Sequence, residues 1–351
     1  MSFGQLPPEI HSAVSSVSDI SSKLSLCLVS KYFYDITLPH LYEVLCLPTR
    51  PRFLSLATTF TYKPEFARLV RHLFASDRNS YEFYVSLPDF IVCFPQNDKE
   101  RTIRRQRIRE WLSEREQELA AYRFAIHQVL SLTSPFLKSL TLLHYEHALN
   151  ILHGLLLLPF PNLVELTIRG DYPPFPPGLY LPALERLHLA AGDTPNPFAS
   201  LATIADGCPR LTHLRITEPI MCILAGPLLA HTIEIALGYA TCNNQILAAT
   251  KVADKCGREV AVGPPRLPPT LTHLLLQTYA AELNAFGVPY PDHVEMQERL
   301  DALQKKSDIF RLLSPLSLAA NDYSLPYCFE VAHRHWEDRM EGGDGCWEDC
   351  C

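Results

Sequence analysis

The chain has 351 residues, and its 47% hydrophobic and 20% charged content is that of a folded globular protein rather than a disordered one. The net charge of −7 is spread along the sequence, which argues against a general affinity for nucleic acid or for anionic membranes. The 29 prolines against 14 glycines indicate many short elements separated by stiff connections, because proline interrupts regular structure.

The sequence indicates a cytoplasmic or nuclear protein. Its first residues, MSFGQLPPEI, show no basic region followed by an apolar core, so we expect no signal peptide. The 11 cysteines are scattered without a framework spacing, which favours free thiols in a reducing compartment. The most apolar stretch, Pro219 to Ala230, is interrupted by Pro227 and is shorter than the roughly 20 residues that a bilayer span needs. We therefore expect this stretch in the core.

Residues 1–45 predict a small all-helical module. Pro7 and Pro8 are suited to a helix start, where a missing N–H costs nothing, and Ile10 and Val14 follow at helical spacing. A second helical stretch begins after Ser18-Asp19, which can cap it. A unit of about 40 residues cannot usually bury enough apolar surface to stand alone. We therefore expect it to lean on a partner or on the rest of the chain.

The segments LPPEI and LSLCLVSKYFYDITLPHLY, within residues 6–42, resemble the F-box, in the version common in proteins of mushroom-forming fungi. In that family the helices bind the Skp-type adaptor of a cullin–RING (SCF-type) ubiquitin ligase. The resemblance implies adaptor binding at the matching positions, which are Leu6, Pro7, Glu9, Ile10, Val14, Leu24, Leu28, Val29, Lys31 and Phe33. The intervening HSAVSSVSDISSK departs from the family by placing serines where large apolar residues are usual. A helical cap on the rest of the chain is the alternative interpretation.

Residues 97–130 predict one long charged helix. Its apolar stripe includes Leu119, Tyr122, Ile126 and Val129. The arginine cluster at residues 104–109 has the composition of a nuclear-import or nucleic-acid patch. The glutamates that follow balance this charge, and we favour an ordinary solvated helix face.

The pattern L-x-x-L-x-(L/I) recurs along the second half of the chain. Clear copies begin at Leu137, Leu163, Leu184, Leu211 and Leu271, at intervals of 26, 21, 27 and 60 residues. Three of these intervals fall near the 20–29 residues of leucine-rich repeats. Residues 230–235 fit the last interval as a degraded copy, and residues 69–75 fit as an early one.

Each copy predicts a half-buried strand, because leucines alternate with polar residues and a proline precedes the run. Helix-compatible stretches such as residues 147–158 and 198–207 lie between copies. Strand plus helix per repeat, stacked, predicts an α/β leucine-rich-repeat solenoid: a curved parallel sheet with helices outside, over residues 46–335. Fungal F-box-like proteins commonly carry such a divergent repeat body after the box, so the resemblance also implies a leucine-rich-repeat body here. The asparagine of many such repeats is largely missing here, which implies irregular repeats.

In such a sheet the residues between the buried leucines face outward on the concave side. Stacking the copies aligns Ser139, Glu165, Arg186, His213 and His273 in one column, and Thr141, Thr167, His188, Arg215 and Leu275 in a second. We expect this face to bind a target protein through Glu165, Thr167, Arg186, His188, His213, Arg215 and His273. A solvated face without a ligand is the alternative.

Near the C-terminus, residues 291–313 predict a helix, and residues 336–351 predict an acidic flexible tail with Trp336 or Trp347 docking back. No phosphate loop, nucleophile elbow, kinase set or HExxH helix occurs, so we expect no enzyme and no cofactor. The histidines and cysteines at residues 333–351 match no standard zinc spacing, and no metal site is predicted.

The sequence therefore favours a binding protein in which an F-box-like helical module precedes a leucine-rich-repeat body. The resemblance implies a substrate-recruiting subunit of an SCF-type ubiquitin ligase, with the adaptor and a target protein as partners and without nucleic acid or membrane. The alternative is a leucine-rich-repeat protein-binding scaffold whose degenerate box no longer engages the ligase. An enzyme on an unrecognised fold is the least favoured interpretation.

Overall fold

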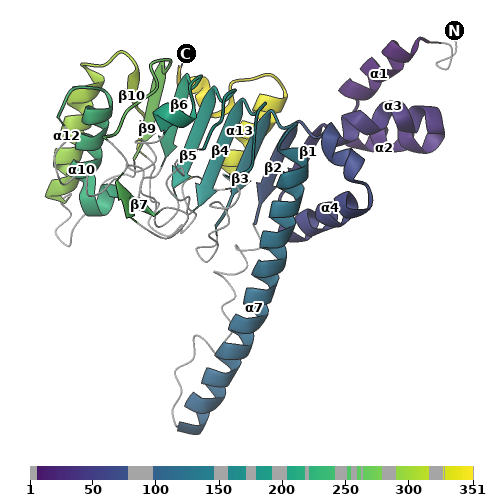
Figure 1. Ribbon diagram of the computed structural model, residues 1–351, viewed down its shortest axis with the longest axis horizontal. Coiled ribbons are helices and arrows are strands. Elements are labelled where there is room, and N and C mark those ends of the chain that lie inside the picture. The colour runs from purple at the N-terminus through teal and green to yellow at the C-terminus, as the bar shows by residue number, and fades with distance from the viewer. Residues whose placement is uncertain are drawn as a thin grey trace.

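A parallel β-sheet organises the chain (Figure 1). The computed structural model describes residues 6–77, 98–145, 157–170, 179–191, 204–217, 221–241, 251–253, 259–261, 264–278, 290–315, 327 and 329–350. Within these ranges, eight strands form one all-parallel sheet in the order β1-β2-β3-β4-β5-β6-β9-β10. Their bounds are β1 Val44–Leu47, β2 His72–Ser76, β3 Ser139–Leu143, β4 Glu165–Gly170, β5 Arg186–Ala191, β6 His213–Thr217, β9 His273–Gln277 and β10 Phe310–Leu312. The short strands β7 (Lys251–Ala253) and β8 (Glu259–Ala261) pair with each other in an antiparallel ribbon.

The strand register stacks the leucines of the repeated pattern directly on one another. Leu140, Leu166, Leu187, Leu214 and Leu274 are Cα partners across five strands. A second ladder holds Leu142, Ile168, Leu189, Ile216 and Leu276, and no member of either ladder is more than 3% exposed. The five predicted strands are confirmed, and the early copy at residues 69–75 overlaps β2. We call this side of the sheet the leucine face.

Helices cover the leucine face. Their bounds are α4 Arg50–Tyr62, the 3-10 helix η2 Pro64–Leu69, α7 Asp98–Thr133, α10 Met221–Ala236 and α12 Pro291–Gln304. Buried side chains of these helices, among them Phe53, Ile126, Ile233 and Leu300, join the leucine ladders in one core. In Figure 1, α4 and α7 lie near the β1 end of the sheet and α10 and α12 near the β10 end, while the N-terminal half of α7 projects from the body. The long helix predicted at residues 97–130 is confirmed.

Two predicted elements differ in the structure. Residues 230–235 belong to helix α10 rather than to a strand, because Leu229, Ala230 and Ile233 are buried at helical spacing and pack in the core with α12. The predicted helix at residues 291–313 ends at Gln304, and the last strand, β10, follows it. Most of the predicted helical stretches 147–158 and 198–207 lies outside the described residues.

Three helices precede the sheet: α1 (Pro8–Val17), α2 (Ile20–Val29) and α3 (Lys31–Tyr42). The carboxylate of Asp19 accepts from the backbone N–H of Ser22 and caps α2, and the Ser30 hydroxyl caps α3 in the same way. Helix α3 packs against both α1 and α2 and runs directly into β1. Tyr42 at its end lies against Phe66, with ring centroids 4.8 Å apart. This contact fixes the three helices to the β1 end of the sheet (Figure 1).

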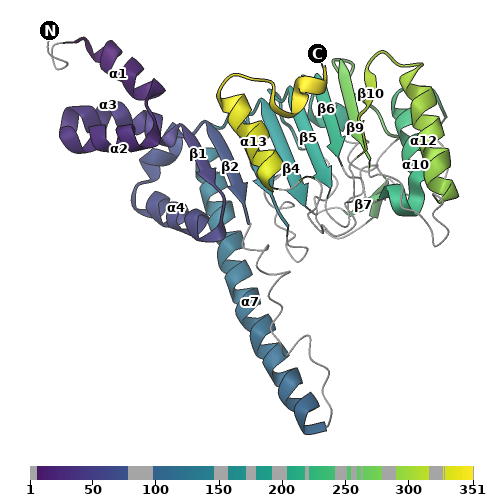
Figure 2. The ribbon, with the colours of Figure 1, turned by 180° about the vertical axis from the view of Figure 1, so that it is seen from behind.

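The C-terminal segment, residues 329–350, lies across the face of the sheet opposite the leucine face (Figure 2). It consists of helix α13 (Phe329–Met340) and the 3-10 helix η3 (Gly345–Cys350). This corrects the flexible tail predicted for residues 336–351. Both tryptophans dock, Trp336 at 8% and Trp347 at 2% exposure, and their burial against the sheet orders the segment.

The leucine ladder should carry the stability of the fold. We expect Leu214→Ala to lower the free energy of unfolding by about 2–5 kcal/mol, because it opens a cavity at a fully buried position. The measurement is urea denaturation followed by circular dichroism. Leu112→Ala, on the projecting part of α7 where the side chain is 53% exposed, is the matched control and should cost far less. Equal losses in the two variants would contradict the packing described above.

Candidate functional site

Helix α1 places its polar side inward and its apolar side outward. Its buried residues are His11 and Ser15, whereas Ile10, Val14 and Val17 are exposed. A surface helix of a globular protein normally has the reverse arrangement. The apolar residues of α1 therefore do not serve the core of this module.

Hydrogen bonds to α3 account for the polar inner side of α1. The hydroxyls of Ser15 and Thr37 lie 3.0 Å apart in a buried pair, and the Ser12 hydroxyl lies 3.0 Å from Nε2 of His40. Nδ1 of His11 lies 2.8 Å from the Tyr32 hydroxyl. Two of the serines that depart from the F-box pattern thus join α1 to α3.

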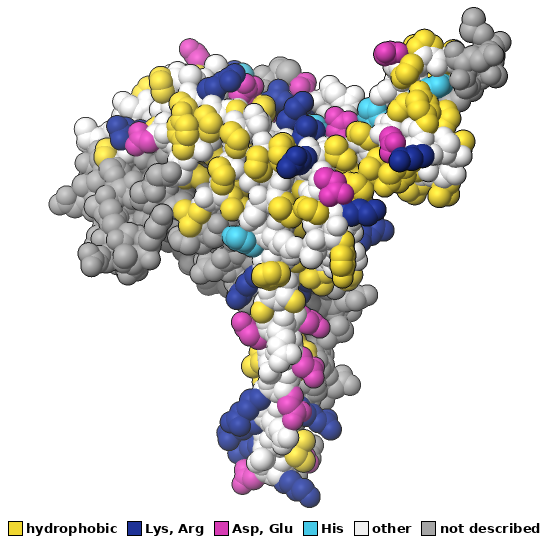
Figure 3. All heavy atoms as spheres, turned by 45° about the vertical axis from the view of Figure 1, so that its right-hand side comes forward, with side chains coloured by type: hydrophobic (Ala, Val, Ile, Leu, Met, Phe, Trp, Pro, Cys, Tyr) yellow, Lys and Arg dark blue, Asp and Glu magenta, His cyan; other side chains and the backbone are white. Residues whose placement is uncertain are grey.

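Helix α2 extends the exposed apolar area. No residue of α2 is buried, and Leu28 and Val29 are 88% and 65% exposed. Together the exposed side chains form what we call the N-terminal apolar surface: Ile10, Val14, Val17, Ile20, Leu24, Leu28 and Val29. Figure 3 shows hydrophobic side chains gathered over these helices. Exposed apolar side chains gathered in one small module are typical of an interaction surface.

The ten positions predicted to bind the adaptor all fall on or next to this surface. Leu6 and Phe33 are half-buried, and the remaining eight are exposed: Pro7, Glu9, Ile10, Val14, Leu24, Leu28, Val29 and Lys31. The structure therefore brings them together in one module and leaves most of them accessible to a partner.

The second candidate surface is the face of the sheet opposite the leucines, which we call the mixed face. The register aligns Ser139, Glu165, Arg186, His213 and His273, and beside them Thr141, Thr167, His188, Arg215 and Leu275. The two predicted columns are confirmed. The mixed face also carries the apolar side chains of Phe74, Leu143 and Ala190, which pack with Trp336.

The C-terminal segment covers the mixed face, which corrects the expectation that these residues face outward. Thr167, His188 and Arg215 are 5%, 0% and 5% exposed. Glu165, Arg186, His213 and His273 are half-buried. The register therefore brings the residues predicted to bind a target together on one face, and residues 329–350 of the same chain cover them.

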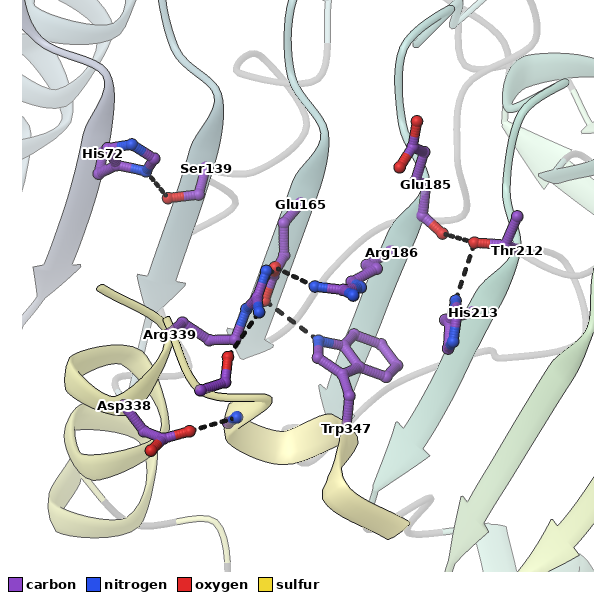
Figure 4. A network of polar contacts seen from close by, with 12 residues as sticks. His72, Ser139, Glu165, Glu185, Arg186, Thr212, His213, Asp338, Arg339 and Trp347 are labelled. Atoms are coloured by element: carbon purple, nitrogen blue, oxygen red, sulfur yellow. Dashed lines mark hydrogen bonds and ion pairs between the residues drawn. The ribbon is translucent and has the colours of Figure 1, made fainter. Parts of the chain in front are cut away.

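Glu165 is the centre of the contact between the sheet and the C-terminal segment (Figure 4). Its carboxylate accepts from Nε of Arg339 at 3.0 Å and from the indole Nε1 of Trp347 at 3.1 Å. On the sheet itself, Arg186 lies 3.7 Å from the same carboxylate. The sequence did not indicate Arg339 as a site residue. The spacing between Arg339 and Trp347 does not reveal that both side chains contact the same carboxylate.

Arg215 forms the second polar contact. It donates to the backbone carbonyl of Cys346 in the C-terminal segment and, within the sheet, to the amide oxygen of Gln277 at 2.9 Å. Trp347 lies edge-on against His188 and His213, with ring centroids 6.4 and 5.7 Å away. The polar contacts of the segment with the sheet therefore include the Trp347 indole, the Arg339 guanidinium, the Cys346 carbonyl and Nε2 of His333, which lies 3.3 Å from Sγ of Cys46.

The C-terminal segment is held in its bent shape by its own contacts. The Asp338 carboxylate accepts from the backbone N–H of Gly345 at 2.7 Å, and Arg339 donates to the carbonyl of Gly343 at 2.7 Å. Gly345 has φ +58°, and a Cβ there would meet the His335 carbonyl oxygen at 2.6 Å. Glycine is needed at this position, and the turn delivers Arg339 and Trp347 to the same side.

A buried polar cluster lies where β2 and β3 end. Asp77 accepts from the backbone N–H of Tyr145 at 3.0 Å and lies 3.8 Å from Arg50 of α4 and 3.7 Å from His144. Asp77, Arg50 and His144 are at most 5% exposed. The cluster ties α4 to the strand ends and offers no accessible group to a ligand.

Burial under the C-terminal segment keeps two histidines of the mixed face neutral. Burial lowers the pKa of His213 to about 4, with further lowering by His273 and Arg186 and an opposing effect of Asp344. Burial also lowers the pKa of His188 well below its usual value, and the charge on Arg215 adds to this. Both imidazoles are uncharged at neutral pH.

Among the described residues, no group of three or more His, Cys, Asp or Glu side chains is arranged to hold a metal ion. No described helix is both long and apolar enough to cross a bilayer. Comparison with protein-family models and with curated proteins finds no match to this chain. The F-box resemblance therefore rests on the residues quoted from the sequence.

The neutral state of His213 predicts a pH dependence of stability. The unfolded chain takes up a proton at this residue near pH 6.5, whereas the folded chain does so only near pH 4. Between pH 6.5 and pH 4 the unfolded state therefore binds more protons at His213 than the folded state does. The free energy of unfolding should fall as the pH is lowered from 7 to 5. His213→Gln removes this contribution, so its unfolding free energy, measured by urea denaturation at each pH, should depend less steeply on pH. A variant whose profile parallels that of the wild type would contradict the burial argument.

Proposed function

We propose that the chain is the substrate-recruiting subunit of a cullin–RING (SCF-type) ubiquitin ligase. In this proposal α1–α3 bind the Skp-type adaptor, the mixed face of the sheet recognises a target protein, and the chain catalyses no reaction itself. The observation that carries the proposal is the inverted helix α1, which buries serine and histidine and exposes valine and isoleucine. Such a helix is stabilised fully only when a partner covers its outer side.

The energetics favour a partner protein on the N-terminal apolar surface. Each fully buried valine, leucine or isoleucine contributes about 1.5–3 kcal/mol. Val17 and Leu28 are 85% and 88% exposed, so most of this contribution is unrealised in the isolated chain. Association entropy opposes binding, and only the surplus appears as affinity. A surface of seven such side chains can supply that surplus.

The position of the module suits a recruiting subunit. Helix α3 leads into β1 without a linker, and Tyr42 is anchored on Phe66 and Phe60. The N-terminal helices stand at the β1 end of the sheet, and the C-terminal segment lies across the mixed face (Figures 1 and 2). An adaptor and a target would bind different surfaces of the chain. In the proposal this assembly acts in the cytoplasm or nucleus.

The test is binding of the purified full-length chain to a purified Skp-type adaptor, followed by size-exclusion chromatography and calorimetry. The wild-type chain should co-elute with the adaptor. Leu28→Asp should abolish co-elution, because a carboxylate cannot be buried at an apolar interface without a partner. Ile10→Asp and Val29→Asp should weaken it strongly as well.

Phe124→Asp is the matched control, because Phe124 is a 72% exposed apolar residue on α7, outside the N-terminal module. It should bind the adaptor like the wild type. All variants should retain their helical circular dichroism, since each changes an exposed side chain. If the wild-type chain does not bind the adaptor, the ligase proposal fails and the scaffold alternative takes its place.

A further inference from the structure

The mixed face has the composition of a surface that is not permanently buried. Parallel strands covered on both sides normally read as near-continuous apolar runs. In β4 to β6, polar Thr167, His188 and Arg215 alternate with leucine-face residues although the C-terminal segment covers them. A fixed core would have no need of a histidine and an arginine at these positions.

The contact between the mixed face and the C-terminal segment is incompletely satisfied. In the part of the chain that the structure describes, Nδ1 of His188 and Nε1 of Trp336 are buried without a hydrogen-bond partner. A cavity of about 20 Å³ remains between β3–β4 and α13, lined by Ser139, Thr141 and Thr167 on the sheet and by His335, Trp336 and Met340 on the segment. A space of this size accommodates about one water molecule. These features fit a docked ligand better than a permanent core.

The mixed face also contains apolar side chains that must be shielded from water. Phe74, Leu143 and Leu275 are each 0% exposed, and the C-terminal segment supplies their cover through Trp336, Phe329 and Trp347. Without the segment, Phe74 and Leu143 on β2 and β3 would be exposed, and so would Leu275 on β9 beside its register partner Arg215. Release of the segment is therefore favourable only when another aromatic ligand takes its place.

We propose that the mixed face is a peptide-binding surface and that residues 329–350 occupy it as an intramolecular ligand which the target protein displaces. This inference rests on the proposed function and specifies its target-binding half. The partner is a protein segment with the same chemistry: an arginine and a tryptophan whose N–H groups converge on Glu165, and a backbone carbonyl that reaches Arg215.

The bound segment also indicates the overall charge of the partner. Residues 329–350 hold seven acidic residues (Glu330, Glu337, Asp338, Glu341, Asp344, Glu348 and Asp349) against two basic ones (Arg334 and Arg339), a net charge of −5. The mixed face offers the cations of Arg186 and Arg215 against the carboxylate of Glu165, whereas His188 and His213 are uncharged at neutral pH. An acidic segment that carries tryptophan and arginine fits this surface.

The experiment measures binding of a labelled synthetic peptide of residues 329–350 to the full-length chain by fluorescence anisotropy under reducing conditions. The chain carrying Arg339→Ala and Trp347→Ala, called the opened variant, loses both donors to Glu165 in cis. It should bind the peptide at least about tenfold more tightly than the wild type, because the affinity scales with the fraction of molecules whose face is free. Equal binding by the two chains would overturn the proposal.

Two further variants test the chemistry of recognition. Glu165→Gln added to the opened variant should weaken peptide binding, whereas Glu185→Gln should not. Glu185 is a matched control because it pairs with Arg210 outside the contact with the C-terminal segment. A peptide with Trp347→Ala should bind more weakly than the parent. Unchanged binding after Glu165→Gln would refute the assigned site.

Hydrogen exchange on the wild-type chain decides the matter if the opened variant does not fold. Amides of residues 329–350 should exchange together and faster than those of β4–β6, as a separately opening unit does. Exchange at the same rate as the strands would show a permanent part of the core and overturn the proposal.

Adaptor binding of the opened variant separates this inference from the proposed function. Adaptor binding without peptide binding overturns the intramolecular-ligand proposal alone. Peptide binding without adaptor binding overturns the ligase proposal and leaves the peptide-binding surface in place.

Discussion

The alternation of side chains across the parallel strands is the constraint on which this structure depends. Leucine and isoleucine at alternate positions of β3 to β6 and β9 bury against α7, α10 and α12 and join most of the apolar residues in one core. A slip of one residue would move every leucine to the opposite face, so the ladder fixes the register. The same register decides what the mixed face presents: Glu165 beside Arg186, and His213 stacked on His273 with ring centroids 4.6 Å apart.

Two surfaces differ from this regular core in which side chains they bury and expose. Helix α1 exposes Val14 and Val17 while burying Ser15, and the mixed face buries His188 and Arg215. The leucine face shows neither feature. Side chains that lower the stability of an isolated chain are retained where they serve another purpose, and contact with other molecules is the purpose that we propose for both surfaces. In this proposal, the binding residues lie where the fold alone does not require such side chains.

Local patterns predicted much of this architecture, and non-local contacts account for what they missed. The alternation of leucines with polar residues predicted the strands and both columns of the mixed face. Leucines at every second position must all lie on the buried side of the sheet, and only one register of neighbouring strands places them there. The pattern at residues 230–235 was ambiguous between strand and helix, and contact with α12 decided it. The acidic, glycine-rich C-terminus predicted flexibility, yet its order depends on Glu165 and Arg215, 174 and 131 positions from their partners Arg339 and Cys346. No local pattern encodes such contacts. The serines of α1 looked like lost anchors because the sequence does not show Thr37 and His40 opposite them.

The charges of the mixed face make exchange of its occupant feasible. When the C-terminal segment leaves, Glu165 keeps Arg186 at 3.7 Å and Arg215 keeps Gln277 at 2.9 Å, so neither ion loses all of its partners. A buried ion pair broken by removal of its only partner would cost about 3–5 kcal/mol. Here the C-terminal segment adds hydrogen-bond donors to Glu165, which already has Arg186 beside it, and a carbonyl acceptor to Arg215, which already donates to Gln277. Its affinity therefore comes largely from Trp336 and Trp347, and a competing segment needs to replace two aromatic contacts rather than to neutralise two bare charges.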